Sequence, residues 1–524
     1  MPRAQTLTLP ADLKAKWYTT RWWPYFLLAA TCAILYSVTL WYGFSPADER
    51  WIITAEKRGL SDLSHLPALF KAQMLGLYYR PLLNVSFMMD MLAGNGSTFN
   101  FHLTNVLLHI VCSLLLFRFF VLLGFERINA LLIALIFAVH PINVQAVAWV
   151  PGRNDTLLTA FVLLSCIFLL RYITGRKIHH LVFHLLFFAC ALFTKESAIL
   201  LPAIFLLLFL FFAKEKRKTT LVAFCGAWIL IPIAWWLMRI QAIENVAPFL
   251  TTFNQNSIAD FFSGLLLHAG KILLPVQQSV MPLLAHTILW PYAVLMLAIA
   301  GLVIKYGVKN KNLALLGLVW FFIIIALPAW TGAVNGNGEH YEHRVYTALP
   351  GALLFLSQVN IPVPETWLRR MLVLLILALG IKTIMRLPVY KDEFSYAKAG
   401  TIEVPSNSFF HDILGTIYLE RKDYHQTVAY FNNAIQLNSN NADYYSRRGE
   451  AHGMLKNYEN AIADDTKALS MDSTLARVYL NRGIAFFHTG DFVKAKKDIE
   501  KAAGYGAPVP PEFVKALSDS LKVD

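Results

Sequence analysis

The residues of this chain best suited to chemistry are two adjacent carboxylates, Asp48 and Glu49, which follow its first long apolar run. A carboxylate beside a membrane is costly unless it is solvated, paired or functional. The two acids open a loop, residues 44–100, between the first two apolar runs. Because a positioned carboxylate can take the proton of a hydroxyl group, we predict a membrane enzyme with Asp48 as its general base. Glu49 is the alternate base or its helper.

Cationic side chains from separate segments complete this candidate site. Arg80 lies in the same loop, and Lys195 and Arg344 lie in turns that the charge pattern places on the same membrane face. Cations bind a phosphate and stabilise the charge that develops as it leaves, and the planar donor fork of arginine suits that group. We therefore predict group transfer from a lipid-linked phosphate held by Arg80, Lys195 and Arg344, with Arg153 as a fourth candidate.

Each of these positions also has a structural interpretation. The two acids fit a solvated loop, and Lys195 with Glu196 fits an ordinary turn pair. Arg153 and the two polar residues after it fit a helix cap. His140 precedes a proline, and that pair fits a helix kink as well as a ligand. These alternatives stay open beside a site that His140, Glu196 and Glu342 would support.

The outer loop before the eleventh apolar run carries a possible metal motif. His340 and His343 are three residues apart, and Glu339 and Glu342 stand beside them. Metal sites need a full set of ligands at a defined geometry, and no second clear set occurs in the chain. We predict no metal site, and a requirement for a divalent metal stays undecided.

The composition indicates a membrane protein with many spans. The chain has 524 residues, 56% of them hydrophobic, and a mean hydropathy of +0.49, which soluble domains rarely reach. Residues 259–285 are broken by two prolines, so we expect them to be re-entrant or interfacial. Eleven spans are predicted, near 24–43, 101–123, 128–150, 155–174, 180–193, 197–213, 219–238, 288–307, 312–330, 346–358 and 369–386.

The positive charge is concentrated in this membrane part. Residues 405–524 carry 14 Lys and Arg against 15 Asp and Glu, whereas the rest of the chain carries 32 against 18. Lys and Arg collect in cytoplasmic loops of membrane proteins, so the excess is no evidence for nucleic acid. With eleven spans the N-terminus is then cytoplasmic, and the candidate site and C-terminus lie outside the cytoplasm.

A repeat of 34 residues begins after Pro405. Gly415, Gly449 and Gly483 are spaced by 34, and small and aromatic residues recur at matching positions around them. This is the tetratricopeptide (TPR) pattern of paired helices. We predict three TPR units and a capping helix at about 507–524. The all-α chain would thus hold a membrane domain at 1–400 and an extracytoplasmic TPR domain at 405–524.

The sequence resembles the transmembrane-and-TPR O-mannosyltransferase family and its bacterial relatives. The resemblance is carried by Tyr79–Leu82, Phe101–His109 and His140–Asp155, and by Thr194–Glu196 and Glu342–Tyr346. It implies a GT-C glycosyltransferase fold, a polyprenyl-phosphate sugar donor and an acidic motif at Asp48-Glu49, with Tyr346 in a supporting position. The family usually has two aspartates in the acidic motif, and Gln145 stands where a glutamate is expected.

The function that we predict is transfer of a sugar from a polyprenyl-phosphate donor to an extracytoplasmic hydroxyl, with inversion. Protein Ser or Thr presented by the TPR domain is one candidate acceptor, and the membrane is the bacterial inner membrane or the endoplasmic reticulum. Two other classes stay open. A non-enzymatic scaffold would use the TPR units to recruit partners, and a transporter would move the lipid-linked sugar. Polar residues on one face favour the enzyme, since a transport path should carry them along its depth.

Overall fold

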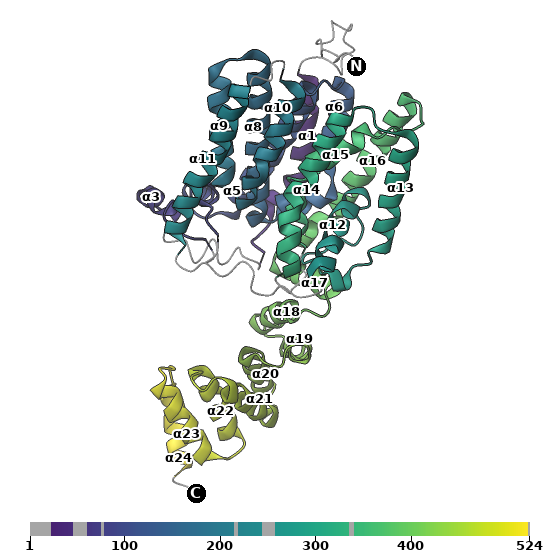
Figure 1. Cartoon of the computed structure of the whole chain (residues 1–524). Helices are drawn as coiled ribbons and strands as arrows, with labels where there is room; N and C mark the ends of the chain where they lie inside the picture. The colour runs from purple at the N-terminus through teal and green to yellow at the C-terminus, as the bar shows by residue number, and fades with distance from the viewer. Residues whose placement is uncertain are drawn as a thin grey trace. The chain divides into compact units, whose positions relative to one another are not determined.

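The computed structural model describes residues 22–45, 60–74, 78–213, 218–243, 257–334 and 340–521. Asp48 and Glu49 lie outside these residues. Within them the regular structure is helical, and only isolated β-bridges occur besides it. The chain divides into two compact units, Met1–Asp392 and Glu393–Asp524. The first unit is a bundle of long helices and the second a stack of short ones (Figure 1).

The α-helices of the first unit occupy the eleven predicted apolar ranges. Short helices α3 and α4 and the amphipathic α12 lie between them, and the short helix α7 lies within the range 128–150 after α6. Their bounds are α1 Trp23–Tyr36, α3 Leu66–Leu69, α4 Pro81–Gly94, α5 Thr98–Leu122, α6 Arg127–Val139, α7 Val144–Ala148, α8 Arg153–Gly175, α9 Ile178–Leu192, α10 Leu201–Phe212, α11 Lys218–Ala242, α12 Ser257–Leu273, α13 Trp290–Tyr306, α14 Lys311–Val334, α15 Leu349–Gln358 and α16 Glu365–Arg386.

The helices are those of a multi-pass membrane protein, but they differ in length. Six are long and apolar enough to cross a membrane alone, and a seventh candidate is the pair α6 and α7, bent by 47°. The four remaining predicted spans coincide with helices of 17 residues or fewer. Of these, α15 has ten residues and rises roughly 15 Å, about half of a hydrocarbon core. Length alone therefore does not make α15 a full span.

The segment 259–285, predicted to be re-entrant or interfacial, begins as a regular helix. Helix α12 has 17 residues and packs against α13 and α14. The chain after it is irregular as far as the short turn Leu284–His286. The buried face of α12 carries His268 and Lys271, so this helix delivers polar groups to the interior of the unit.

The second unit contains the three predicted helix pairs. They are α18 Ser408–Glu420 with α19 Tyr424–Leu437, α20 Ala442–Met454 with α21 Tyr458–Met471, and α22 Ala476–His488 with α23 Phe492–Gly504. Helix α17, Glu393–Glu403, precedes them and belongs to this unit, so the division falls before the predicted boundary at 400–405. Helix α24, Pro511–Ser520, follows in the place of the predicted cap.

The glycines of the repeat mark the closest contact within each helix pair. A Cβ atom at Gly415 would lie 2.8 Å from the ring of Phe431, and one at Gly483 would lie 2.9 Å from Ile499. In the middle repeat, a Cβ atom at Gly449 would lie 2.6 Å from a carboxylate oxygen of Asp465. Asp465 thus occupies the core position that an apolar residue fills in the other two repeats.

Asp465 is fully buried, and neither of its carboxylate oxygens has a hydrogen-bond partner. Burial, with Asp464 next in importance, raises the pKa of Asp465 from its usual 3.8 to about 8. A raised folded-state pKa means that the folded unit holds the proton more tightly than the unfolded chain. Its contribution to stability is complete below the usual pKa and is lost as the pH rises toward 8.

We expect the middle repeat to lose about 2–3 kcal/mol of unfolding free energy between pH 5 and pH 7. Asp465→Leu should remove this dependence and stabilise the repeat at pH 7. Hydrogen exchange of the α20 and α21 amides measures the unfolding free energy of this repeat. The variant and wild-type full-length chains are compared at each pH so that the intrinsic exchange rates cancel. Asp465→Asn is the control that keeps the shape without the charge. Parallel pH curves for the wild type and Asp465→Leu would contradict the expectation.

Candidate active site

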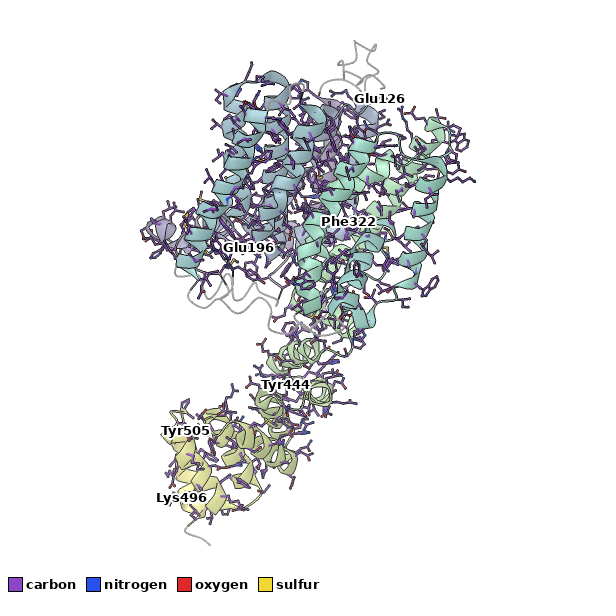
Figure 2. The ribbon with its side chains drawn as sticks, in the orientation of Figure 1. Glu126, Glu196, Phe322, Tyr444, Lys496 and Tyr505 are labelled. Atoms are coloured by element: carbon purple, nitrogen blue, oxygen red, sulfur yellow. The ribbon has the colours of Figure 1, made fainter. Side chains whose placement is uncertain are left out.

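Separate segments bring charged side chains to one end of the first unit. Arg80 precedes α4, Asp155 lies in the first turn of α8, and Lys195 precedes the short helix η7, Glu196–Leu200. The loop helix η9, Glu342–Val345, adds the fourth segment. In Figure 2, Glu196 and Glu126 lie at opposite ends of this unit. The candidate site therefore depends on how these four segments pack against one another.

Arg80 is held by a carboxylate 116 residues further along the chain. Its Nε and Nη2 atoms donate to Oε2 of Glu196 at 3.0 and 2.8 Å. The backbone N–H of Tyr79 donates to the other oxygen of Glu196 at 3.3 Å, and the guanidinium lies 4.0 Å from the ring centre of Tyr78. The alternative interpretation of Lys195 and Glu196 as an ordinary turn pair does not hold, because Glu196 pairs with Arg80.

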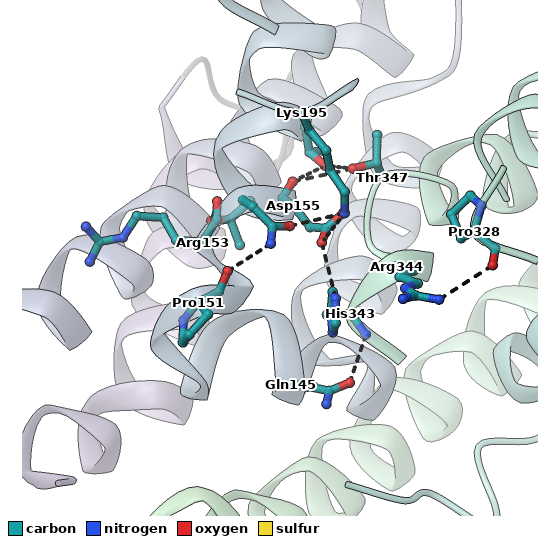
Figure 3. Close-up of polar contacts among 12 residues, drawn as sticks. Gln145, Pro151, Arg153, Asp155, Lys195, Pro328, His343, Arg344 and Thr347 are labelled. Carbon is teal, nitrogen blue, oxygen red and sulfur yellow. Dashed lines mark hydrogen bonds and ion pairs between the residues drawn. The ribbon is translucent and has the colours of Figure 1, made fainter. Parts of the chain in front are cut away.

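Lys195 is bound to Asp155. Its Nζ atom lies 2.7 and 2.8 Å from the two carboxylate oxygens of Asp155 and 3.1 Å from Oδ1 of Asn154. Figure 3 shows this group with the hydroxyl of Thr347 and the ring of His343 beside it. An ammonium group has three donors, and these contacts can occupy all of them. Lys195 thus fixes the position of Asp155 as well as adding charge.

Asp155, which Lys195 binds, also lies near other polar groups of this end. His343 Nε2 lies 3.9 Å from Asp155 Oδ2, and the hydroxyl of Thr347 donates to its backbone carbonyl at 3.4 Å. Arg80 and Arg344 are both close enough to act on its ionisation. No site role was predicted for Asp155 from the sequence, although its place at the end of the His140–Asp155 motif was a signal.

Arg344 belongs to η9 and lies near Asp155. Its Nη1 atom donates to the backbone carbonyl of Pro328 at 3.5 Å, as Figure 3 shows, and its guanidinium lies 5.2 Å from the ring centre of Tyr341. Burial, and then the charges of Lys195 and Arg344, hold the pKa of His343 well below its usual value. His343 is therefore a neutral imidazole beside Asp155.

A second buried ion pair borders the site and was missed by sequence reasoning. Nζ of Lys271 donates to Oε1 of Glu342 at 2.7 Å, and both side chains are 2% exposed. The backbone N–H of Ser279 donates to the same oxygen at 3.0 Å. The available signal was a lysine inside an apolar segment, which calls for a partner. Glu342 thus supports the site by anchoring α12 and the chain after it.

Arg153, predicted as a fourth phosphate ligand, is enclosed in protein instead. It is fully buried and forms an ion pair with Asp90 at 2.5 Å. Its Nε donates to Asn105 at 2.7 Å, and its Nη2 donates to the carbonyl of Phe101 at 2.7 Å. Figure 3 shows its guanidinium extending away from Asp155. Since its donors are occupied by protein, we leave Arg153 out of the proposed phosphate-binding group.

His140 and Tyr346 have structural partners. His140 accepts from the N–H of Ile142 through Nδ1 at 3.2 Å and donates to the carbonyl of Ile272 through Nε2 at 2.9 Å. It therefore caps the bend between α6 and α7. The hydroxyl of Tyr346 lies 2.7 Å from Nδ1 of His109. Both residues connect helices beneath the site rather than facing Asp155.

Gly152 permits the close approach of the Arg153–Asp155 turn to the preceding helix. A Cβ atom there would lie 2.6 Å from the backbone oxygen of Gln145 and 2.8 Å from Cα of Ala146. Both are backbone atoms, which cannot move aside as a flexible side chain can. Gln145 itself connects two segments, since it accepts from the N–H of His343 at 3.1 Å and donates to the carbonyl of Val280 at 3.2 Å.

Among the described residues, no group of three or more His, Cys, Asp or Glu side chains has an arrangement that could hold a metal ion. His268 and His340 do lie together, with ring centres 5.4 Å apart. Burial and the charge of Arg344 lower the pKa of His340 to about 4. These two imidazoles are therefore neutral polar groups next to the cations.

The sequence of this chain is similar to those of known proteins in two regions. Residues 85–238 match the family described as dolichyl-phosphate-mannose-protein mannosyltransferase, and residues 411–441 match the tetratricopeptide repeat. The chain is similar to the transmembrane-and-TPR O-mannosyltransferases. The first matched range includes Asp155 and Lys195 and ends before Arg344. The resemblance read from the sequence motifs is confirmed.

The relatives are protein O-mannosyl-transferases by name. Tmtc1 of Drosophila melanogaster is 35% identical over 121 residues, which is 23% of this chain and 14% of that protein. F38B6.6 of Caenorhabditis elegans is 24% identical over 363 residues, 65% and 51% of the two chains. TMTC2 of Homo sapiens is 35% identical over 98 residues, 19% and 12%. The chain thus spans about half or less of each of these TMTC proteins.

One solved structure is similar to the repeat region. It is the TPR domain of Arabidopsis OM64, at 28% identity and a TM-score of 0.21, and the match covers 22% of this chain and 94% of that one.

Proposed function

We propose that this TMTC-like chain is a membrane glycosyltransferase that moves a sugar from a polyprenyl-phosphate donor to a hydroxyl group outside the cytoplasm. The observation that carries the proposal is the convergence of Arg80, Lys195 and Arg344 on one end of the membrane unit. Three segments far apart in sequence supply them. The names of the relatives support the reaction class and suggest mannose as the sugar and protein Ser or Thr as the acceptor.

The charges of this end suit a phosphate. Four cations, Arg80, Lys195, Lys271 and Arg344, stand near three carboxylates, Asp155, Glu196 and Glu342, among the described residues. The excess is positive, and the neighbouring histidine is neutral. Buried carboxylates hold the cations in place before any ligand arrives, which lowers the cost of ordering them on binding.

Arg80 and Arg344 are the proposed direct phosphate ligands. Glu196 occupies Nε and Nη2 of Arg80, so Nη1 remains as the donor for the ligand. Lys195 adds charge from its place on Asp155. In the neighbouring segments, Glu342 and Lys271 hold η9 against α12, and they thereby set the position of Arg344.

The proposed reaction proceeds in one displacement at the anomeric carbon. The acceptor hydroxyl gives its proton to the carboxylate of Asp48, with Glu49 as the alternate base. Its oxygen forms a bond to the anomeric carbon as the bond from that carbon to the donor phosphate oxygen breaks. The electron pair leaves with the polyprenyl phosphate, where the cations stabilise it, and the configuration of the sugar inverts. The TPR unit would present the protein acceptor.

The test is sugar transfer by the purified full-length chain from labelled polyprenyl-phosphate mannose to a peptide rich in Ser and Thr. We expect the double variant Asp48→Asn, Glu49→Gln to keep its yield and lose transfer by about 100-fold or more, the effect of losing a general base. Each single variant then identifies the residue that takes the proton. Unchanged transfer by the double variant would reject the assignment of the base.

The same preparation separates the two other classes of function. Movement of the labelled lipid across vesicles without transfer to a peptide would support a transporter. A scaffold would tolerate changes at Arg80 and Arg344 while changes in the helix pairs at 411–500 abolished its function. Either result would reject the enzyme.

A further inference from the structure

A large cavity in the membrane unit extends from His140, beneath the candidate active site, toward the opposite end of the unit. It has a volume of about 930 Å³ and is lined by parts of α6, α12, α13, α14, α15 and α16. Helix α13 packs chiefly against α12, so it stands off from the helices on the other side of the cavity. Ligand sites in proteins commonly have volumes of about 300–1,000 Å³, and this one is of a size to hold lipid chains.

The lining changes from polar to apolar along the helices. On α6 it passes from Asn129 to Ile133 and Ile136, and His140 lines the cavity just beyond the end of that helix. On α16 it passes from Arg369 through leucines to Leu379. Ten or eleven helical residues rise roughly 16 Å, which is about the hydrocarbon depth of one membrane leaflet. The cavity therefore has the length of a phospholipid chain, with its polar end at the start of both helices.

This polar end lies at the opposite end of the unit from Arg80 and Glu196. Arg369 forms an ion pair with Glu126, the residue that Figure 2 labels far from Glu196. Trp367 is 57% exposed beside Arg369, and exposed tryptophan is typical of the membrane–water interface. A lipid bound here would have its head group away from the proposed donor site.

The charged groups in the lining are of both signs. Arg369 donates to Asn129 at 3.1 Å and to Oε1 of Glu365 at 2.7 Å. Asn129 donates to that same oxygen at 3.3 Å, which leaves Oε2 of Glu365 to accept from a further donor. Lys309 lies exposed in the same lining. The ammonium group of Lys309 and the carboxylate of Glu365 are thus both available to contact a lipid head group.

We propose that this cavity binds one zwitterionic phospholipid whose head group carries a phosphodiester and an amine, as in phosphatidylethanolamine. Lys309 and Arg369 face the phosphate, Glu365 accepts from the amine, and the acyl chains fill the apolar part between α13 and α16. The proposal is independent of the proposed enzymatic activity, because it concerns a different lipid with its head group at the other end of the unit.

The test is native mass spectrometry of the full-length chain released from nanodiscs made of equal parts phosphatidylethanolamine and phosphatidylglycerol. We expect one phosphatidylethanolamine to stay bound to the wild type. Leu372→Trp fills the cavity with an indole and should abolish this binding. Leu374→Trp is the matched control on the same helix, since Leu374 is 65% exposed and does not line the cavity.

A second variant keeps the test informative if Leu372→Trp does not fold. Lys309→Ala removes an exposed charge, and we expect roughly fivefold less bound lipid. Retention of the lipid at wild-type level by Leu372→Trp, or its equal loss from Leu374→Trp, would overturn the site. A preference for phosphatidylglycerol would overturn the head-group assignment, and a bound polyprenyl phosphate in its place would overturn the occupant.

Discussion

Replacing Arg153 with methionine should destabilise the membrane unit by about 3–5 kcal/mol. The guanidinium is fully buried, and its loss leaves Asp90 as a buried charge without its counter-ion. It also removes the donors that serve Asn105 and the carbonyl of Phe101. Thermal unfolding of the purified full-length chain in detergent, followed by intrinsic fluorescence, measures the change.

The pair variant Arg153→Met, Asp90→Leu shows how much of this loss comes from the stranded carboxylate. It should recover part of the stability but not all, because the backbone carbonyl of Phe101 still lacks its donor. Arg171→Met is the matched control at the other end of α8, where the guanidinium lies 5.6 Å from the ring centre of Phe168. We expect that control to change stability by less than about 1 kcal/mol. Equal losses in Arg153→Met and Arg171→Met would contradict the structural role.

Replacing Arg344 with methionine should lower sugar transfer by about 10²–10³-fold. Its guanidinium is one of the cations that act on Asp155, and it donates to the carbonyl of Pro328 at 3.5 Å. A cation that stabilises a developing charge contributes about this factor to a reaction rate. Initial rates of transfer from labelled polyprenyl-phosphate mannose, at saturating peptide, give the measurement.

Arg370→Met is the matched control for charge. Arg370 lies 5.2 Å from the ring centre of Trp367, in the helix turn next to the proposed phospholipid rather than near Asp155. We expect it to retain transfer within about twofold of the wild type. A variant Arg344→Lys tests whether charge alone suffices, and it should recover only part of the rate since it lacks the planar fork. Full activity in Arg344→Met would remove this residue from the phosphate site.

Much of the fold was predictable because its signals are local. Apolar runs predicted the helices of the membrane unit, and the 34-residue spacing of Gly415, Gly449 and Gly483 predicted the paired helices after Pro405. Each signal needs only residues within one helix or one repeat. The same spacing did not predict the environment of Asp465, because the protonation of an acid in a core position depends on the residues that pack against it.

The candidate site was predictable in part. The charge pattern placed Arg80, Lys195 and Arg344 on one membrane face, and in the structure all three lie near Asp155. The roles of Arg153 and Lys271 were not predictable, since an arginine near a site and a lysine in an apolar segment each fit several environments. Burial decided both cases: Arg153 is enclosed with Asp90, and Lys271 is enclosed with Glu342.

The sequence by itself determined that the chain is helical, that it carries a membrane part and a TPR part, and which charged residues share one end. Only the tertiary structure decided the partners: Glu196 for Arg80, Asp155 for Lys195 and Asp90 for Arg153. The physical reason is the range of the interactions. Helix periodicity is set by neighbours a few residues apart, whereas an ion pair forms between groups within 4 Å in space. The partners in these three pairs are 40 to 116 residues apart in the chain.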